Sequence, residues 1–550
     1  MGLCFSLIYR FGISFFAGMM DKNKKSLQCE EEDGLLARAA QIASAQLQNE
    51  ASSSTSYRRR CTEEEVDMDA SSSDSEDGKT DSDQDCETRM SRVRDELFQR
   101  NQQSKRFDRV SINNQESANE LKEDMMNRCV AKTSVLKVCR LMQLGRNLFR
   151  RHPGPAIRSC ERRCLENRFF PNQRKVFEQL RTKFFCCQYV DNGNELAIAA
   201  QDETIRFYAP SGKQRKYHMT NQYRLQGVNW SVLDVAMAPN GRALAYGTWK
   251  DAVVYCTLGE PTVDAPEGIS FHLLDIPSVD TATAVFTVRV NQDGTEVLAG
   301  TSDGSLNIFD IETRRRIVYV EDAHGDDVNA CCYNNDNEAL FFSGGDDGLV
   351  KVWDRRALSR LGDPTPVGIF AGHRDGITYI DSRGDNRYLL SNCKDQSIKL
   401  WDLRHFSPAS AAKATMAAVQ EQNWDYRWQA PPTKMRRYSK CIEGDTSVMT
   451  FRGHCVLHTL VRAKFSPENT GRRYIYTGCA RGEVIVYDIL CEKVEQRLPG
   501  HIAVVRDCAW HPEFNEIATT GWDGYAAIWN FDERKDRQPA IKLSKCHKIG

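Results

Sequence analysis

Three short stretches carry residues that could do chemistry, and each lacks the partners that its chemistry needs. Gly300-Thr301-Ser302-Asp303-Gly304 matches the pattern of a serine nucleophile, but a strand pattern follows where a nucleophile elbow requires a helix. Gly78-Lys79-Thr80 lacks the upstream glycine of a phosphate-binding loop. Cys160 and Cys164 have no second Cys or His pair that could complete a zinc site. The sequence therefore predicts no catalytic site, no cofactor and no metal centre.

Two aspartate–arginine pairs are candidates for binding rather than for catalysis. Trp353-Asp354-Arg355-Arg356 and Trp401-Asp402-Leu403-Arg404 share the pattern Trp-Asp-x-Arg, and their tryptophans lie 48 residues apart. A guanidinium presents donors in a fixed plane and suits bidentate recognition of carboxylates. The alternative is that both arginines are merely solvated and that Asp354 only caps its own turn. We expect Asp354, Arg356, Asp402 and Arg404 to lie on one rim of the fold.

The elements that position these pairs form a repeat. Each pair ends a hairpin pattern, and in both copies an Asp precedes the Trp by six residues. The same spacing recurs, so that the repeat aspartates are Asp202, Asp251, Asp303, Asp347, Asp395 and Asp523. A seventh unit ends at Tyr487 and has Arg481 at this position. A short carboxylate there can accept hydrogen bonds from turn N–H groups, and from an upstream His where one is present (His324, His373 and His501), so we expect a structural role.

Seven such units, with Gly-His and Trp-Asp pairs, predict an all-β, seven-bladed WD-repeat β-propeller over residues 181–548. Either Arg174–Leu180 or Ala540–Lys545 could supply the strand that closes the ring. An insertion at about 406–446 contains Trp424, Arg427 and Trp428, which could anchor a partner or pin the loop to the propeller. Trp424-Asp425-Tyr426-Arg427 repeats the motif letters, but it has no preceding hairpin and is not expected to end a blade.

The region before the propeller is expected to be disordered and partly helical. Residues 1–25 are largely apolar, and Gly2 and Cys4 are candidate acylation sites, so the segment could anchor in a membrane, be acylated or do neither. Residues 26–130 are Ser-rich and include eleven acids between Glu63 and Asp85, which predicts a disordered region with short helices. Residues 131–180 are basic, and Val135–Phe149 has the pattern of an amphipathic helix.

Composition narrows the classes of function. The 550 residues have a net charge of −1, which gives no electrostatic case for direct nucleic-acid binding. Twenty cysteines without a C-x-x-C pair fit buried thiols in a reducing compartment. We therefore expect a protein of the cytoplasm and nucleus, with tethering to the mitochondrial outer membrane through residues 1–20 as a further expectation.

The repeat resembles that of a known family. An apolar pair, small residues, an Asp, an alternating strand and Trp-Asp-x-Arg form the box of WD-repeat substrate receptors of cullin-4 ubiquitin ligases. The likeness extends from Phe169 to Trp529, and the runs that carry it are Gly227–Ala236, Asp375–Ser382, Gln422–Trp428 and Arg452–Leu460. The apolar residues 1–20 do not resemble the family's usual start.

This resemblance implies a non-enzymatic subunit of a ubiquitin ligase. Asp354, Arg356, Asp402 and Arg404 would bind the adaptor called damaged-DNA-binding protein 1, and the helix Val135–Phe149 would wedge into it. The substrates implied are proteins marked for degradation, such as a cap-n-collar leucine-zipper stress-response transcription factor. Two rival hypotheses remain: a propeller scaffold for another complex, and a membrane-tethered regulator that sequesters its partner.

Overall fold

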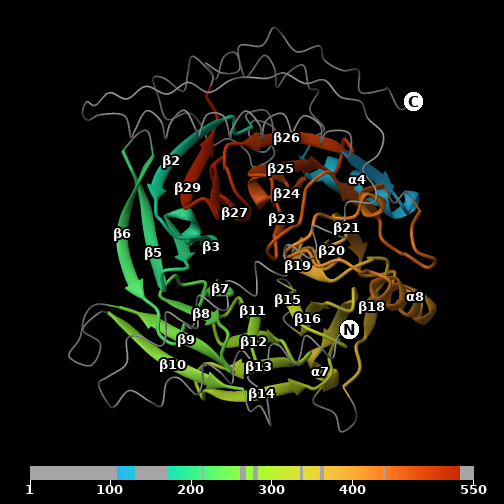
Figure 1. The fold of residues 1–550 in the computed structure, drawn as a ribbon, viewed down its shortest axis with the longest axis horizontal. Helices are drawn as coiled ribbons and strands as arrows, with labels where there is room; N and C mark the ends of the chain where they lie inside the picture. Colours follow the sequence, from blue (N-terminus) through green and yellow to red (C-terminus); the bar gives the residue numbers. More distant parts are fainter. Residues whose placement is uncertain are drawn as a thin grey trace, which may run out of the picture. The chain divides into compact units, whose positions relative to one another are not determined.

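The computed structural model describes residues 108–129 and 170–532, apart from 213–214, 229, 260–267, 277–282, 335–338, 359–363 and 438–439. In these residues seven antiparallel sheets are arranged in a ring around a common axis (Figure 1). Six sheets have four strands and one has five. The prediction of a seven-bladed propeller is confirmed.

The first three blades are built from consecutive strands, innermost strand first. Blade 1 contains β3 (Phe184–Val190), β4 (Glu195–Ala200), β5 (Thr204–Ser211) and β6 (Lys216–Arg224), with a 3-10 turn at Asp191–Gly193. Blade 2 contains β7 (Asp234–Met237), β8 (Ala243–Gly247), β9 (Ala252–Leu258) and β10 (Ile269–Asp275). Blade 3 contains β11 (Val285–Val290), β12 (Glu296–Thr301), β13 (Leu306–Asp310) and β14 (Arg315–Val320).

The next three blades include the two motif hairpins. Blade 4 contains β15 (Val328–Tyr333), β16 (Leu340–Gly345), β17 (Val350–Asp354) and β18 (Gly368–Phe370), with the short helix α7 (Arg355–Leu358) after β17. Blade 5 contains β19 (Ile377–Ser382), β20 (Tyr388–Cys393), β21 (Ser397–Asp402) and β22 (Met449–Arg452). Blade 6 contains β23 (Ala463–Phe465), β24 (Tyr474–Gly478), β25 (Glu483–Asp488) and β26 (Lys493–Pro499), with a 3-10 turn at Glu468–Thr470.

Blade 7 closes the ring with a strand from the N-terminal side. It contains β27 (Val505–Trp510), β28 (Ile517–Gly521) and β29 (Tyr525–Asn530), and β2 (Gln173–Gln179) pairs antiparallel with β29. Of the two candidates for closure, the first is therefore the one used, and the propeller begins at 173 rather than at 181. The other candidate, Ala540–Lys545, lies outside the described residues.

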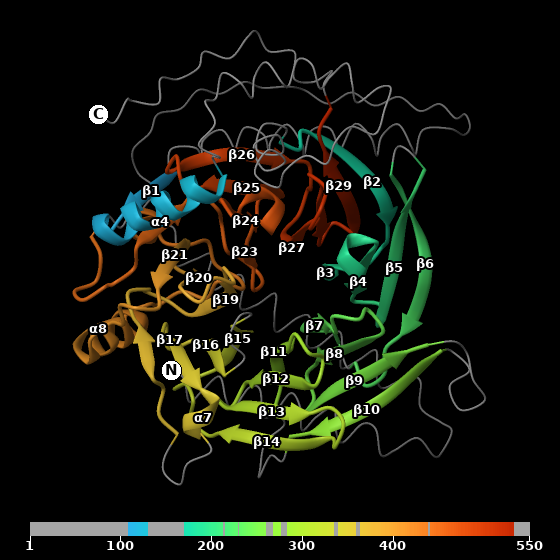
Figure 2. The ribbon, with the colours of Figure 1, turned by 180° about the vertical axis from the view of Figure 1, so that it is seen from behind.

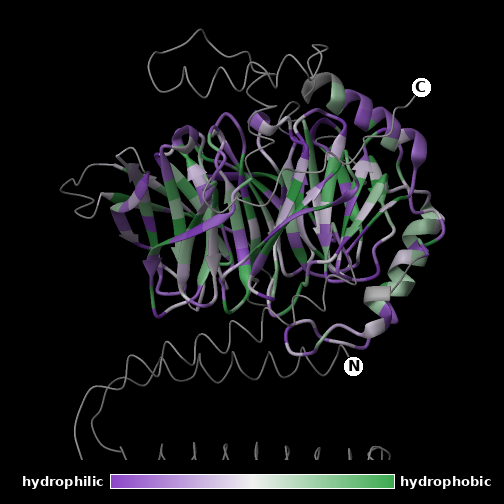
Figure 3. Cartoon of the chain, turned by 90° about the horizontal axis from the view of Figure 1, so that it is seen from above, coloured by the Kyte–Doolittle hydropathy of each residue, from purple (hydrophilic) through white to green (hydrophobic). Residues whose placement is uncertain are grey.

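Apolar side chains fill the space between neighbouring blades. Strand residues alternate, so each sheet presents apolar side chains to a neighbour; Phe342, Val352 and Trp401, for example, share the cluster between blades 4 and 5. Figure 3 shows the hydrophobic residues concentrated in the strands and the hydrophilic ones toward the turns. The ring therefore fixes the turns at its two faces, where binding residues can be held rigidly.

The two faces of the ring are defined by topology. In each antiparallel blade, the turns after the first and third strands lie at one end, and those after the second and fourth lie at the other. We call the first end the motif face, because Asp354–Arg356 and Asp402–Arg404 follow third strands. We call the other end the insertion face, because parts of the insertion pack there.

A strand and a helix precede the propeller in the region 26–130, for which the sequence predicts disorder with short helices, and the prediction of disorder is wrong for residues 108–129. Strand β1 (Arg109–Ile112) pairs with β22 as the fifth strand of blade 5. Helix α4 (Gln115–Cys129) follows and buries Ala118, Leu121 and Met125 in the cluster between blades 5 and 6 (Figure 2). Residues 108–129 are thus part of the folded unit.

The insertion after β21 is folded as well. It contains α8 (Ala409–Gln420), whose alanines Ala411 and Ala412 pack on Leu349 and Ala371, and α9 (Thr433–Arg437). Figure 1 shows α8 outside the ring beside β18.

Candidate functional site

The two Trp-Asp-x-Arg motifs adopt the same geometry at the ends of β17 and β21. Asp354 Oδ1 accepts hydrogen bonds from the backbone N–H of Arg356 at 2.9 Å and from its Nε at 3.0 Å, while Oδ2 accepts from Nη2 at 2.7 Å. In the next blade the corresponding distances from Arg404 to Asp402 are 3.1, 3.1 and 2.8 Å. Each Asp therefore holds the Arg two residues later in a fixed orientation.

The same fork forms where no blade ends. In the insertion, Asp425 Oδ1 accepts from the backbone N–H of Arg427 at 2.9 Å and from its Nε at 3.0 Å. No described strand precedes or follows this stretch within the insertion, so the prediction that it does not end a blade is confirmed. The fork therefore does not require the end of a blade. The letters Asp-x-Arg do not suffice for it either, because the side chain of Arg387 pairs with Glu120 and Asp402 and not with Asp385 two residues earlier.

Arg356 is the more exposed of the two motif arginines. Its side chain is 72% exposed, against 47% for Arg404. Burial would raise the pKa of Asp402, but hydrogen bonds from the side chain and backbone of Arg404 outweigh it, and this pKa lies below its ordinary value. Asp402 is consequently a charged, buried anchor, and the guanidinium of Arg356 is the one that a partner can reach most freely.

Helix α4 covers the blade-5 motif. Glu120 Oε2 lies 2.7 Å from Arg404 Nη2 and also pairs with Arg387, which in turn contacts Asp402. Hydrogen bonds from Arg404 and Arg387 hold the pKa of Glu120 below its usual range. One turn later, Asp124 lies 3.3 Å from Arg383. The motif face at blade 5 is therefore a composite of propeller and helix.

Local signals for this helix exist in the sequence. Asn114 precedes the helix and its Oδ1 accepts the backbone N–H of Ser117 at 3.1 Å, as expected of an N-cap. Ala118, Leu121 and Met125 have the spacing of one helix face. The helix predicted at Val135–Phe149 lies outside the described residues.

The repeat aspartates are structural, and three of them form a buried network. Asp347, Asp395 and Asp523 pair with His324, His373 and His501 at 3.0, 3.1 and 3.1 Å. The other ring nitrogen of each His contacts a hydroxyl, which also accepts the indole N–H of the blade's Trp; these hydroxyls belong to Ser343, Ser391 and Thr519. The network joins the turn at the insertion face to the third strand.

The other three repeat aspartates lie at the equivalent turns of blades 1 to 3, and Asp202 also pairs with Arg206. Asp202 and Asp303 accept the backbone N–H two residues later, at 3.3 and 3.0 Å. Asp251 lies at the equivalent turn and is exposed. Near Asp395, Cys393 and His373 are close enough to form a metal site with it. Their atoms are already engaged, since His373 contacts Asp395 and Ser391 and the Cys393 thiol donates to the carbonyl of Asp375 at 3.0 Å.

The insertion residues lie at the opposite face from the motif. The indole N–H of Trp424 donates to Asp375 at 2.9 Å, and the carbonyl of Tyr426 accepts from His458. Asp375 and His458 both precede first strands, so this contact is on the insertion face. Trp424 therefore pins the loop, whereas Trp428 is 82% exposed and the side chain of Arg427 is 55% exposed.

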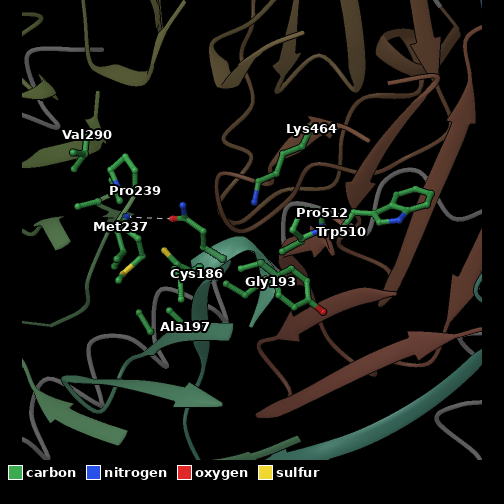
Figure 4. Close-up of a pocket in the computed structure, with 18 of the residues that line it drawn as sticks. Cys186, Gly193, Ala197, Met237, Pro239, Val290, Lys464, Trp510 and Pro512 are labelled. Carbon is green, nitrogen blue, oxygen red and sulfur yellow. Dashed lines mark hydrogen bonds between the residues drawn. The ribbon is translucent and has the colours of Figure 1, made fainter. Parts of the chain in front are cut away.

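A cavity of about 550 Å³ lies between the inner strands (Figure 4). Figure 4 shows Lys464 with its ammonium group directed into it, but this group pairs with Asp507 at 2.7 Å. Across the axis, Arg462 of blade 6 and Arg289 of blade 3 each lie 2.6 Å from Asp234 of blade 2. Burial opposes the charge of Asp234, yet the two arginines lower its pKa to about 2. Asp234 therefore links blade 2 to its neighbour, blade 3, and to the more distant blade 6, which is a structural role.

The N-terminal candidates cannot be placed. Gly2 and Cys4 lie outside the described residues. Among residues 108–129 and 170–532, no helix combines the length and apolarity that crossing a membrane requires.

Comparisons with known proteins agree with this architecture. The family described as WD domain, G-beta repeat matches residues 315–354, 364–402 and 492–530. The DDB1- and CUL4-associated factor 11 homolog of Caenorhabditis elegans is 46% identical over 472 residues, which cover 84% of this chain and 81% of that protein. Its counterpart from Caenorhabditis briggsae is 47% identical over 451 residues, covering 80% and 79%.

A plant protein is more distantly similar. The LEC14B protein of Lithospermum erythrorhizon is 35% identical over 366 residues, which cover 66% of this chain and 75% of that protein. The nematode matches extend across most of both chains at high identity. With its seven WD-type blades and paired Trp-Asp-x-Arg turns, the chain belongs to the family of DDB1- and CUL4-associated factor 11 proteins.

Proposed function

We propose that this protein is a substrate receptor of a cullin-4 ubiquitin ligase and binds the DDB1 adaptor through its motif face. The observation that carries the proposal is the pair of identical Asp–Arg forks on neighbouring blades, with Arg356 72% exposed. The names of the two nematode relatives, which associate those proteins with DDB1 and CUL4, support it. The role is recruitment, and the ligase's other subunits supply the chemistry.

The composite surface of α4 and blade 5 gives this interface a second part. Between Gln115 and Met126, the exposed residues of α4 are Gln115, Glu116, Asn119, Glu123 and Met126. Arg404 holds the helix through Glu120, so in this proposal Arg404 is a positioning residue and Arg356 contacts the adaptor. The helix at Val135–Phe149 remains a further candidate for the same interface.

The insertion face is then free for the substrate. Trp428 is exposed there, and an exposed Trp beside an Arg is typical of interface anchors. By family resemblance we propose a cap-n-collar leucine-zipper stress-response transcription factor as one substrate. Holding adaptor and substrate on one rigid ring raises the effective concentration of substrate lysines near the ligase. The protein is proposed to act in the cytoplasm and nucleus.

The test is a pull-down of purified DDB1 by the full chain and by Arg356→Glu combined with Arg404→Glu. We expect the wild type to bind and the double variant to lose binding while its melting curve keeps a single transition near that of the wild type. A matched control is Lys216→Glu combined with Arg242→Glu, two exposed cations on blades 1 and 2. A wild-type protein that never binds DDB1 would leave a propeller scaffold with another partner.

A further inference from the structure

A cleft with a surplus of positive charge lies where the two additions to the propeller meet. The edge strand β1 supplies Arg109 and Ser111, its neighbour β22 supplies Arg452, and the insertion supplies Lys440; Arg374 and Lys399 are the other cations of the lining. We call this site the basic cleft. It requires both β1 and the insertion, so a bare propeller would not have it.

Alternation along β1 directs the charges into the cleft. Val110 and Ile112 pack against the apolar cluster between blades 5 and 6. Successive strand residues point to opposite sides, so Arg109 and Ser111 project to the other side of the sheet, toward the insertion. The strand therefore buries one set of side chains and presents the other to the cleft.

The charges in the cleft do not balance. Five cations line it, namely Arg109, Arg374, Lys399, Lys440 and Arg452, and Asp395 is the one carboxylate of the lining. Asp395 is already held by His373 and by the hydroxyl and N–H of Ser397. Lys399 is paired with Asp445 at 2.5 Å, which removes one cation from the surplus.

Arg109 and Arg452 are placed against each other. They are direct partners in the register of β1 and β22, and like charges at such positions are destabilising. Among the described residues, Arg452 donates to the backbone carbonyls of Asp395 at 3.3 Å and Met435 at 3.4 Å. Within the described part of the chain, no carboxylate forms an ion pair with Arg109, Arg452 or Lys440. An anion between them would relieve this repulsion.

We propose that the basic cleft binds an acidic segment of a partner protein, with carboxylates held by Arg109, Arg452 and Lys440. Arginine forks match carboxylates in bidentate geometry, and an ammonium adds a point charge. A nucleic acid fits less well, because the lining contains no aromatic residue on which bases could stack and the chain has a net charge of −1.

The position of the cleft deepens the proposed function. Strand β1 starts at Arg109 near the insertion face and leads to α4 on the motif face, so the arginine pair lies at the end of blade 5 away from Arg404. An acidic segment in the cleft would leave the adaptor surface uncovered. The inference rests on the proposed function only in naming that segment as part of a substrate.

The experiment measures binding of a short fluorescent peptide that alternates Glu and Ser to the full chain, by anisotropy and without adaptor. A peptide with Gln in place of Glu is the neutral control. We expect the acidic peptide to bind, the neutral one to fail, and Arg109→Glu combined with Lys440→Glu to weaken binding by about tenfold or more. Both side chains are exposed, so the double variant should fold.

The control variant is Lys216→Glu combined with Arg242→Glu, which makes the same change of charge elsewhere on the ring and should retain binding. Equal affinity for the Glu and Gln peptides, or equal loss in both double variants, would overturn the proposal. Tighter binding of a single-stranded oligothymidine of the same charge would also overturn it. Because DDB1 pull-down is scored separately, failure of the cleft and failure of the receptor role can be told apart.

Discussion

Glu120 and Arg404 are joined by an ion pair of 2.7 Å between Oε2 and Nη2, across 284 positions of sequence. The pair fixes α4 over one of two chemically identical forks, whereas the arginine side chain of the other fork is 72% exposed. Blade 4 thus presents Arg356 to solvent, while blade 5 uses Arg404 to hold a helix. The two Trp-Asp-x-Arg motifs therefore have different neighbours, and substitutions of Arg356 and Arg404 should have different effects on α4.

We predict that Arg356→Glu lowers adaptor affinity without altering hydrogen exchange in α4. Arg404→Glu should instead raise exchange across Gln115–Met125, because it places a second carboxylate beside Glu120 and removes the helix's anchor. Hydrogen exchange followed by mass spectrometry, with adaptor pull-down in parallel, measures both effects.

Glu120→Gln is the control for the same relationship. This substitution removes the negative charge of the ion pair and leaves Arg356 and Arg404 in place. The backbone amides of α4 should therefore exchange faster, while Arg356 should still bind the adaptor. Unchanged exchange in both Arg404→Glu and Glu120→Gln would show that the apolar packing of α4 and its other ion pairs, such as Asp124–Arg383, hold the helix without Glu120.

The buried network of blade 5 should contribute more to stability than its exposed counterpart in blade 3. Asp395→Ala removes the acceptor of His373 and Ser397 in a site that solvent does not reach, and we expect the free energy of unfolding to fall by about 3 kcal/mol. Asp303→Ala removes a turn acceptor at an exposed position and should cost about 1 kcal/mol. Urea denaturation of both variants gives the comparison, and equal losses would contradict it.

The repeat could be predicted because its determinants are local. The strand alternation, the turn and the Asp six residues before Trp353, Trp401 and Trp529 all lie within one hairpin. Ring closure could not be predicted in the same way. Gln173–Gln179 and the C-terminal candidate both read as edge strands, and only pairing with β29 distinguishes them.

Of the surface formed by the motifs and α4, only the part with local determinants could be predicted. The forks at Asp354 and Asp402 form within three residues, so their geometry follows from the motif. Helix α4 was missed because the acidic composition of residues 26–130 obscured the local cap at Asn114. The helix is anchored by residues that are distant in sequence, namely Arg383, Arg387 and Arg404, and no local sequence pattern predicts these contacts.

Asp327 should destabilise the fold at neutral pH. Burial, with the carboxylates of Asp346 and Asp326 nearby, raises the pKa of Asp327 to about 7. Its unfolded pKa is about 4, so its contribution to stability is fully present below that pH and is lost as pH rises through 7. Asp327→Asn stays neutral and should be more stable than the wild type by about 1 kcal/mol at pH 8, since partial exposure screens the repulsion. The two proteins should melt alike at pH 4.

Asp346→Asn should change the melting temperature at pH 8 in the opposite direction from Asp327→Asn. Asp346 pairs with Lys394 at 2.6 and 2.7 Å, so neutralising it breaks an ion pair and should lower the melting temperature at pH 8. If both variants shifted the melting temperature in the same direction at pH 8, repulsion at Asp327 would not be the cause.

The two tryptophans of the insertion should separate loop anchoring from partner binding. Trp424→Ala removes the hydrogen bond to Asp375 and should increase proteolytic cleavage between residues 406 and 446. Trp428→Ala should leave the cleavage rate, the melting temperature and DDB1 binding unchanged, because the side chain is 82% exposed. Limited proteolysis and co-precipitation of cellular partners measure these outcomes. Loss of a partner in Trp428→Ala alone would assign Trp428 to substrate binding, whereas no loss would move the search to the basic cleft near the same face.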